Sequence, residues 1–403
     1  MAAVEADEAL ASVRAARNLA LHRAAEEGAV DECRALLAPN RALADGHADW
    51  DGSADVWFAD DAMIGWDALH FAADAGHAPV VRLLLDHGAL WNAVDELGMS
   101  AGELAWSRNY TRCYELLFEE GVRQSFLKDL LVRRAQGDAG GGRGTENAEE
   151  ATAVVAAAGD ELLLVSGTQN EVTYSNAAFL ASPLSFSQDG RGQWRCLDQD
   201  GNMVMAEWED GIMLASADAL CADQADGFAV LNVGFGLGII DEAIQRYRPG
   251  RHVIIEPHPD ALAFMRAQGW DRRSGVEIWE GTWESFLLAD DGAGGAALGD
   301  FDAVYFDTYS QDYHDLRAFF DCLPNLLAGP GARFSFFHGL AATNKFLYDV
   351  YTRTVELDLR EIGLATTWRT LTPRVDEITW KGVKCRYWTL DQYYLPLAHM
   401  QLW

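Results

Sequence analysis

The stretch Val230-Leu-Asn-Val-Gly-Phe-Gly-Leu-Gly238 decides the fold of the second half of this 403-residue chain. A short apolar run enters a glycine-rich turn, and a helix-like segment begins at Ile239. Glycines here allow a tight turn and close approach of the backbone to a ligand. The next apolar run ends at Glu256, twenty residues after Gly236, where an acid can accept both ribose hydroxyls of a nucleotide. Together these features predict a strand, turn and helix that bind a nucleotide-type cofactor.

The spacing of the glycines narrows the choice of cofactor. A dinucleotide fingerprint needs glycine or alanine in the sixth place of Gly-x-Gly-x-x-Gly. Here the glycines are Gly234, Gly236 and Gly238, and Ile239 fills the sixth place. Gly-x-Gly-x-Gly is the commoner form in S-adenosylmethionine (AdoMet) enzymes, so the pattern favours AdoMet. The alternative, a loop glycine with a solvated glutamate, is disfavoured because the turn and the acid coincide.

Short apolar runs alternate with helix-like segments on both sides of this turn. That alternation is typical of a doubly wound parallel sheet. Ala365–Arg374 and Lys384–Leu395 are rich in Thr, Trp and Tyr with no clear helix between them, and they predict an antiparallel pair that completes the sheet. We therefore expect an α/β, Rossmann-like domain. The runs interpreted as parallel strands are Phe228–Val233, His252–Glu256, Val276–Glu280, Phe301–Asp307 and Arg333–Phe337.

The first third of the chain has helical periodicity and an internal repeat. Gly65 and Gly98 begin similar segments 33 residues apart, which is the ankyrin period. The region from about residue 15 to 122 resembles ankyrin repeats, with Asp67-Ala-Leu-His70 at the usual Thr-Pro-Leu-His position. We expect His70 to hydrogen-bond neighbouring backbone rather than to act in chemistry. Two or three repeats barely bury a core by themselves. We therefore expect the repeat region to pack on further protein.

A glycine-rich and acidic segment, Asp138–Glu150, contains no large apolar residue and reads as a flexible linker. It predicts three parts. We expect residues 1–135 to form an all-α, ankyrin-like repeat region, 136–160 an acidic Gly-rich linker, and 161–403 the domain that binds AdoMet.

Charge and composition limit the partners and the compartment. The chain has 62 Asp and Glu against 31 Lys and Arg, a net charge of -31, which repels nucleic acid and anionic membranes and attracts basic protein. The six cysteines are scattered and the histidines lack metal-ligand spacing, so we expect no metal. We find no membrane-length apolar run. Acids at Glu5, Asp7 and Glu8 argue against a targeting peptide, so we expect a cytoplasmic protein, with the nucleus as a second compartment.

Carboxylates are the candidate reacting groups. Asp307 ends the fourth apolar run, where a side chain faces the ligand crevice of a parallel sheet. Glu207, Glu209 and Asp210 precede the first run, and composition alone interprets them as a solvated helix face. Two carboxylates that converge on one crevice suit a cation, and guanidinium takes bidentate hydrogen bonds from carboxylates.

Residues from about 203 to 395 resemble guanidinoacetate methyltransferase, and more closely the fungal-type protein arginine delta-N-methyltransferases, which also carry N-terminal ankyrin-like repeats and an acidic linker. With the repeats included, the resemblance covers nearly the whole chain. It rests on Val204–Glu209, Val230–Asp241, His258–Asp260, Gly269-Trp270, Gly281–Glu284, Phe306–Tyr309, Phe334–Gly339 and Cys385–Trp388.

The resemblance implies a role for each matching position. Glu209 and Asp307 are the implied catalytic pair that clamps a guanidino group. Asn232 stands where guanidinoacetate methyltransferase has an acid, and His338 stands where relatives have asparagine, so the role of His338 stays open. The implied substrate-binding residues are Trp208, Met213, Thr308 and Tyr309. The implied cofactor-binding residues are Gly234, Phe235, Gly236, Gly238, Glu256 and Asp307, with Gly281, Thr282 and Trp283 beside the adenine.

The predicted activity is transfer of the AdoMet methyl group to the internal, delta nitrogen of arginine in a basic protein, with S-adenosylhomocysteine as the product of the cofactor. The resemblance suggests a ribosomal protein as the target. One alternative is a small-molecule guanidino N-methyltransferase of the guanidinoacetate type. Another is an ankyrin-type interaction scaffold whose second domain binds AdoMet without catalysis. The target, the oligomeric state and the task of the repeats stay undetermined at this level.

Overall fold

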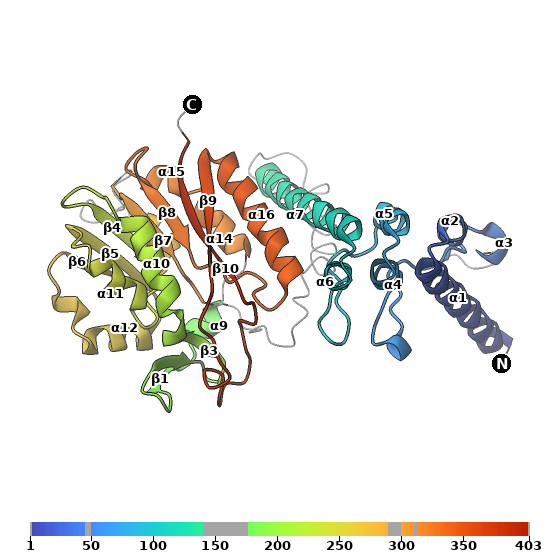
Figure 1. Cartoon of the computed structure of the whole chain (residues 1–403), viewed down its shortest axis with the longest axis horizontal. Coiled ribbons are helices and arrows are strands. Elements are labelled where there is room, and N and C mark those ends of the chain that lie inside the picture. The colour runs from blue at the N-terminus through green and yellow to red at the C-terminus, as the bar shows by residue number, and fades with distance from the viewer. Residues whose placement is uncertain (1, 45–49, 140–175, 289–299, 310–312, 402–403) are drawn as a thin grey trace. The chain divides into compact units, whose positions relative to one another are not determined.

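The computed structural model describes residues 2–44, 50–139, 176–288, 300–309 and 313–401 (Figure 1). The chain forms two compact units. Unit 1 consists of Met1–Gln169 and Asn344–Thr354, and unit 2 consists of Asn170–Thr343 and Val355–Trp403. The predicted linker lies outside the described residues from residue 140 onward, while residues 136–139 belong to the last turn of helix α7.

Unit 1 is a stack of helix pairs, as the repeat period predicts. The first helices of the pairs, α1, α4 and α6, pack on one another, and so do the second helices, α2, α5 and α7. Each pair alone leaves an apolar face open, so stacking is what buries the core. The helices are α1 Ala2–Glu27, α2 Val30–Leu37, α3 Arg41–Ala44, η1 Asp61–Met63, α4 Ala68–Asp74, α5 Ala78–Asp86, α6 Ala101–Ser107 and α7 Thr111–Ala139.

Equivalent caps begin the first helix of two successive repeats. The Asp67 carboxylate accepts the backbone N–H groups of Leu69 and His70 at 2.9 and 3.0 Å at the start of α4. Ser100 accepts the N–H of Glu103 at 3.3 Å at the start of α6, 33 residues later. His70 is buried between the Asp67 carboxylate and the Met99 carbonyl, so its role is structural, as expected.

A distant segment completes unit 1. Asn344–Thr354, the first part of helix α16 (Lys345–Glu361), belongs to this unit. The Phe346 ring lies 6.0 Å from the Trp91 ring and 5.4 Å from the Tyr114 ring. Gly102 allows this contact, because a Cβ there would lie 2.3 Å from the Phe346 ring. The repeats therefore pack on further protein of the same chain.

Unit 2 is built on a seven-stranded sheet of order β6-β5-β4-β7-β8-β10-β9. The strands from β6 to β8 are parallel, and β10 is antiparallel to both of its neighbours. This is the expected Rossmann-like sheet with an antiparallel pair at its end. The strands are β4 Ala229–Val233, β5 Arg251–Glu256, β6 Val276–Glu280, β7 Ala303–Phe306, β8 Arg333–Phe336, β9 Leu364–Leu371 and β10 Tyr393–Met400.

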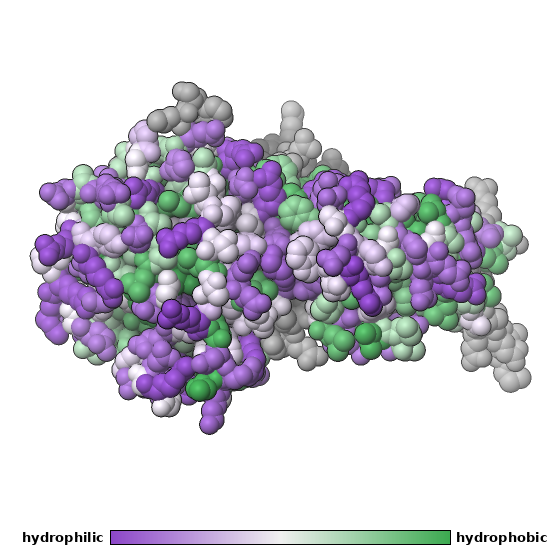
Figure 2. Space-filling model, viewed as in Figure 1, coloured by the Kyte–Doolittle hydropathy of each residue, from purple (hydrophilic) through white to green (hydrophobic). Residues whose placement is uncertain are grey.

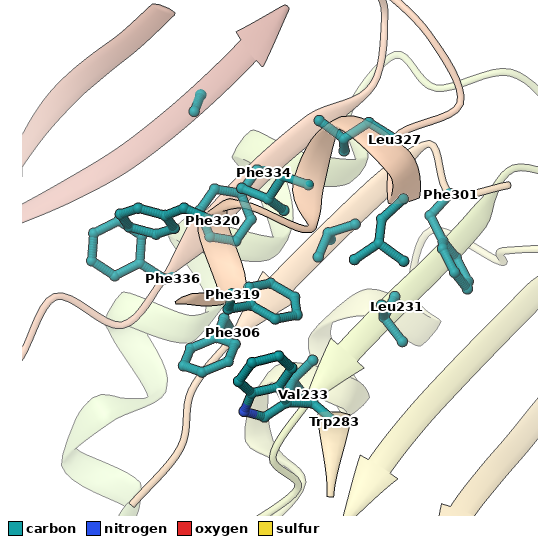
Figure 3. Close-up of a cluster of buried hydrophobic side chains, with 14 of the residues drawn as sticks. Leu231, Val233, Trp283, Phe301, Phe306, Phe319, Phe320, Leu327, Phe334 and Phe336 are labelled. Atoms are coloured by element: carbon teal, nitrogen blue, oxygen red, sulfur yellow. The ribbon is translucent and has the colours of Figure 1, made fainter. Parts of the chain in front are cut away.

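Alternate residues of each strand face different helical layers. In β7, Val304 and Phe306 pack with a phenylalanine-rich cluster that includes α14 and α15 (Figure 3). Ala303 and Tyr305 face the layer that contains α10 and α11. The helices of this unit are α9 Asn176–Leu180, η2 Glu207–Glu209, α10 Asp210–Cys221, α11 Ile239–Gln245, α12 Pro259–Ala267, η3 Trp270–Arg272, α13 Trp283–Leu288, α14 Tyr313–Phe320, α15 Leu323–Leu326 and the end of α16.

Two features of unit 2 differ from the sequence-based expectation. The last strand is β10, Tyr393–Met400, and not Lys384–Leu395; it pairs with β9 from Tyr393 opposite Leu371 to Met400 opposite Leu364. The aromatic residues before Tyr393 are buried by packing between rings rather than by a strand ladder, which explains the misplaced boundary. A small antiparallel sheet of β1 Ser185–Gln188, β2 Trp194–Leu197 and β3 Met203–Ala206 was not anticipated.

Candidate active site

The glycine-rich turn follows β4 and lies between the ends of β5 and β7. The Gly234 N–H donates to the Ile255 carbonyl at 2.9 Å, and the residue has φ +94°. A Cβ on Gly234 would lie 1.8 Å from the Asp307 carbonyl oxygen, so no other residue fits without movement of β7. Gly238, with φ +73°, precedes the first turn of α11. The turn thus presents backbone and a helix N-terminus at the carboxyl end of the sheet.

Glu256 ends β5 beside this turn. Its carboxylate accepts the N–H of Phe235 at 2.9 Å and the N–H of His258 at 2.7 Å. Burial raises the pKa of Glu256, and the backbone N–H groups counter that effect. A carboxylate has about four acceptor sites, so capacity for ribose hydroxyls remains. A glycine cradle with an acid at the end of the adjacent strand fits the ribose and tail of AdoMet.

Asn232, at the end of β4, holds the glycine-rich turn by hydrogen bonds. Its amide Nδ2 donates to the Gly234 carbonyl and to Asp241 Oδ1, both at 2.8 Å. Asp241 also lies 3.1 Å from His252 Nε2, and all three side chains are fully buried. An ionised acid in place of Asn232 has no hydrogen to donate and would face the Asp241 carboxylate. This contact is a physical reason for an amide at position 232.

The segment expected beside the adenine follows β6 at the same edge of the sheet. Thr282 directly precedes α13; its Oγ1 accepts the Ser285 N–H at 3.3 Å and its carbonyl accepts the Ser285 hydroxyl at 2.6 Å. Trp283 is largely buried, and its ring lies 5.4 Å from the Phe319 ring. Gly281 lies close to Trp279 and Ser285, with little room for a side chain. These contacts hold the segment in place at the edge where the sequence predicts the adenine.

Asp307 and Glu209 come from different elements. The Asp307 N–H donates to the Val233 carbonyl at 2.9 Å, which continues the ladder of β7 and keeps the alternation that turns Tyr305 toward α10. Glu209 lies in η2, immediately before α10, and is 3% exposed. The solvated helix face inferred from composition is therefore wrong for Glu209 and holds only for Asp210, which is exposed. The fold buries one acid of the trio.

The two carboxylates are electrostatically coupled. Burial raises the pKa of Glu209, and the charge of Asp307 raises it further. Burial also raises the pKa of Asp307, with the Asp241 charge as a second cause. Two acids whose ionisation is disfavoured in this way gain free energy when a cation binds between them. The pair is thus suited to a guanidinium and to accepting a proton near neutral pH.

Tyr387 is a further residue of the site, for which the resemblance over Cys385–Trp388 implies no role. Its hydroxyl donates to Glu209 Oε1 and accepts the indole N–H of Trp208 at 3.0 Å. The rings of Trp380 and Trp388 lie 6.2 and 6.0 Å from the Trp208 ring. Trp208, predicted to bind substrate, is thus a member of the aromatic cluster behind Glu209. In the sequence, Tyr387 lies in a run of aromatic residues interpreted as a strand, and such a run gives no signal of its hydrogen bond to Glu209.

The remaining predicted residues surround Asp307 at different depths. Thr308 and Tyr309 are half-buried directly after it, and the Tyr309 ring lies 4.8 Å from the Phe179 ring. Met213 is fully buried in α10, where its sulfur accepts the Tyr305 hydroxyl at 3.3 Å. Burial lowers the pKa of His338 to about 3, so this side chain is neutral at ordinary pH. The backbone N–H of His338 donates to the Tyr393 hydroxyl at 3.0 Å.

The described residues contain no group of three or more His, Cys, Asp or Glu side chains placed to hold a metal ion. Among the helices that the structure describes, none is long and apolar enough to cross a membrane.

Comparison with known proteins identifies relatives of both units. A family model described as ankyrin repeats (3 copies) matches residues 21–126, and one described as guanidinoacetate N-methyltransferase matches residues 193–352. The chain is 35% identical over 368 residues to protein arginine N-methyltransferase 2 of Cryptococcus neoformans, covering 87% of this chain and 89% of the relative. It is 37% identical over 330 residues to the protein of that name from Aspergillus oryzae, covering 79% and 77%. For the Eremothecium gossypii protein of that name the values are 34% over 343 residues, covering 80% and 79%.

The fold, the glycine turn and the matched domain define an AdoMet-dependent methyltransferase with N-terminal ankyrin repeats. The two matched regions follow the same order as the two predicted parts. The chain belongs to the protein arginine N-methyltransferase 2 family.

Proposed function

We propose that this enzyme methylates the internal, delta nitrogen of an arginine side chain in a basic protein. The observation that carries the proposal is the pair of acids beside the glycine turn: Glu209 is buried, Asp307 directly follows β7 and is half-buried, and the charge of Asp307 raises the pKa of Glu209. AdoMet, when bound, supplies the methyl group from its sulfonium. Gly234 and Glu256 are proposed to hold it, and the two carboxylates are proposed to orient the acceptor.

The clamp accounts for the choice of nitrogen. Carboxylates prefer the two terminal nitrogens of a guanidinium, where they form parallel hydrogen bonds. At ~4 Å and an effective dielectric of ~20, each such pair is worth about 4 kcal/mol before desolvation. With the terminal nitrogens held, positive charge is drawn toward the carboxylates and the internal nitrogen is left facing the methyl donor. A preorganised field of this kind, together with fixed orientation, lowers the barrier to transfer.

The proton of the internal nitrogen needs an acceptor. The methyl group replaces the single hydrogen on that nitrogen, and the proposed acceptor of the proton is Asp307. The raised pKa of Asp307 makes it a stronger base than an ordinary carboxylate, and the end of β7 holds it rigidly. Because the internal nitrogen carries one hydrogen, the expected product is delta-monomethylarginine without a dimethyl form.

The repeats are proposed to take part in recognition of a basic protein substrate. Exposed Met63 and Leu97 lie on the tips of neighbouring loops, which the Glu96 N–H joins by donating to the Ile64 carbonyl at 3.0 Å. A hydrophobic strip is visible at the lower edge of this unit, below α4 and α6 (Figure 2). Residues 50–107 carry a single Lys or Arg, Arg82, against the acids Asp51, Asp55, Asp60, Asp61, Asp67, Asp74, Asp86, Asp95, Glu96 and Glu103. Of these acids Asp67 and Asp95 are buried, while Asp51, Asp55, Asp61, Asp86 and Glu96 are exposed. Exposed apolar residues beside exposed acids suit a cationic protein segment.

The family resemblance suggests a ribosomal protein as the target, and we place the reaction in the cytoplasm with the nucleus as a second compartment. Incubation of the enzyme with radiolabelled AdoMet and cell extract, followed by identification of the labelled band, tests the target. Fragmentation of the methylated residue distinguishes the isomers. Omega-monomethylarginine or dimethylarginine as the main product would overturn the proposed orientation of the guanidino group.

The small-molecule alternative is tested in the same assay. Guanidinoacetate carries a carboxylate that needs a cationic anchor, whereas arginine in a protein does not. Purified enzyme is therefore expected to label a basic protein fraction and to leave guanidinoacetate unmethylated. The reverse preference would favour the guanidinoacetate-type reaction.

A further inference from the structure

The hydrogen bonds of Glu209 divide its two oxygens. Among the described residues, both donors to this carboxylate, the Ala206 N–H at 3.4 Å and the Tyr387 hydroxyl, bond to Oε1. The carboxylate is 3% exposed, so it has little access to water. Oε2 is therefore the oxygen available to a ligand.

The direction of the chain of hydrogen bonds is fixed by chemistry. An indole nitrogen can only donate, so the Tyr387 oxygen is the acceptor of the Trp208 N–H at 3.0 Å. The hydroxyl hydrogen is then free to point at Glu209 Oε1, which accepts it as a carboxylate. The arrangement Trp208 to Tyr387 to Glu209 thus suits an ionised Glu209. Rings of Trp380, at 5.2 Å from Tyr387, and of Trp208, at 5.7 Å, keep the phenol in place.

We propose that Tyr387 is a positioning residue of the reaction: its hydroxyl holds Glu209 Oε1 and so presents Oε2 to the guanidinium of the substrate. This role rests on the proposed carboxylate clamp. Tyr387 itself touches neither the reacting nitrogen nor the methyl group in this account, and it acts through Glu209.

The charge balance at Glu209 supports the assignment. Burial and the Asp307 charge raise the pKa of Glu209, and the hydrogen bond from Tyr387 lowers it. The other titratable groups that face this carboxylate are Tyr305 and Tyr393, whose own pKa values are raised by burial first and by neighbouring charges. Neither is charged at neutral pH. The Tyr387 hydroxyl, together with the Ala206 N–H, therefore opposes the effects of burial and of Asp307 on the pKa of Glu209.

The test is the pH profile of Tyr387→Phe, which removes one hydroxyl and keeps the ring. The full-length enzyme is assayed by transfer of tritiated methyl from AdoMet to an acid-extracted basic protein fraction, with total label counted whatever nitrogen is modified. Loss of the hydrogen bond raises the pKa of Glu209, so the acidic limb of kcat/KM is expected to move to higher pH. We expect a loss of about tenfold at neutral pH, partly recovered in alkali. Calorimetric binding of S-adenosylhomocysteine should stay parental.

Tyr247→Phe is the matched control, because Tyr247 donates to a carboxylate, Asp218 Oδ1, at 3.0 Å on the surface. Its pH profile should equal that of the parent. An unmoved acidic limb in Tyr387→Phe, with cofactor binding intact, overturns the proposal and leaves the methyltransferase function standing. If Tyr387→Phe loses S-adenosylhomocysteine binding, the variant Trp208→Phe is tested in its place, because it removes the indole N–H that donates to the Tyr387 hydroxyl. The acidic limb of its kcat/KM profile should also move to higher pH. A pH profile equal to that of the parent overturns the proposal. A parent that labels no protein arginine instead contradicts the proposed function itself.

Discussion

At the scale of single residues, the candidate site contains two carboxyl groups whose ionisation is disfavoured by their surroundings. Glu209 and Asp307 are acids whose pKa values are raised by desolvation first and by a neighbouring carboxylate second. Without a bound cation, such a pair of acids adds nothing to the stability of the fold. The arrangement costs stability in the free enzyme, and the cation proposed to lie between the two carboxylates would offset that cost.

The first prediction removes the charges and keeps the shapes. Asp307→Asn and Glu209→Gln should each lower kcat at least about a hundredfold, because a preorganised electrostatic contact to the reacting group is lost. Binding of S-adenosylhomocysteine, measured by calorimetry, should change little in Glu209→Gln. If both variants keep more than about a tenth of the parental rate, a difference of only ~1.4 kcal/mol, the carboxylate clamp is wrong.

The second prediction concerns stability against pH. A carboxyl group whose pKa is raised on folding stabilises the fold most below its unfolded pKa, and this contribution is lost as pH rises through the folded value. The free parent should therefore lose stability from the ordinary carboxyl range upward through the raised values. Glu209→Gln should unfold at a higher temperature than the parent above that window.

Thermal unfolding scans at several pH values check the second prediction. The difference between Glu209→Gln and the parent should shrink in acid, where Glu209 is protonated in both states of the parent. A difference that is independent of pH would show that charge at this position has no influence on the fold.

At the scale of elements, the turn between β4 and α11 is the part of the site that the local sequence specifies most completely. The glycines adopt positive φ, and the neighbouring strand ends approach too closely for side chains. Alternation along β7 then turns Asp307 toward the same layer as α10. The β9–β10 pair closes the sheet, and the residues before β10 deliver Tyr387 to Glu209 without regular secondary structure.

The third prediction tests that turn. Gly234→Ala places a Cβ 1.8 Å from the Asp307 carbonyl, so β7 must shift and with it Asp307. We expect unfolding free energy to fall by about 2 kcal/mol or more and S-adenosylhomocysteine binding to weaken at least tenfold. Gly190→Ala is the control, because a Cβ there meets nothing within 4 Å. Equal behaviour of the two variants would contradict the close approach of the strand ends.

At the scale of the whole molecule, the compact units do not follow the order of the sequence. Asn344–Thr354 belongs to unit 1 although most of the surrounding residues belong to unit 2. Phe346 and Val350 are buried, and Tyr114 donates to Asp349 at 2.7 Å. The repeats therefore bury apolar side chains of the first part of α16, in addition to the recognition role proposed for them.

The fourth prediction follows from that burial. Removal of residues 1–135 exposes Phe346 and Val350, so the truncated chain should aggregate and show a lower unfolding temperature than the full chain. Gel filtration and thermal scans measure both effects. Phe346→Ser with Val350→Ser in the truncated chain should restore much of the monomer. A truncated chain that is already monomeric, with the parental unfolding temperature, would show that this burial contributes nothing.

The sequence alone determined the local features. The turn Gly234–Gly238, the five parallel strands and the 33-residue period of the repeats were all predicted, because glycine geometry, apolar runs and repeat spacing act over short stretches of chain. The family match also follows from the order of motifs. The residue roles at the site stay predictions that the experiments must decide.

Only the tertiary structure decided which polar groups meet. Glu209 has the same composition around it as the exposed Asp210, and its burial depends on β3, α10 and the segment that carries Tyr387. The start of β10 at Tyr393 and the membership of Asn344–Thr354 in unit 1 likewise depend on contacts between residues far apart in the chain. Such contacts leave no periodic or local signal, because burial and hydrogen bonding are set by the packing partner rather than by the neighbouring residues.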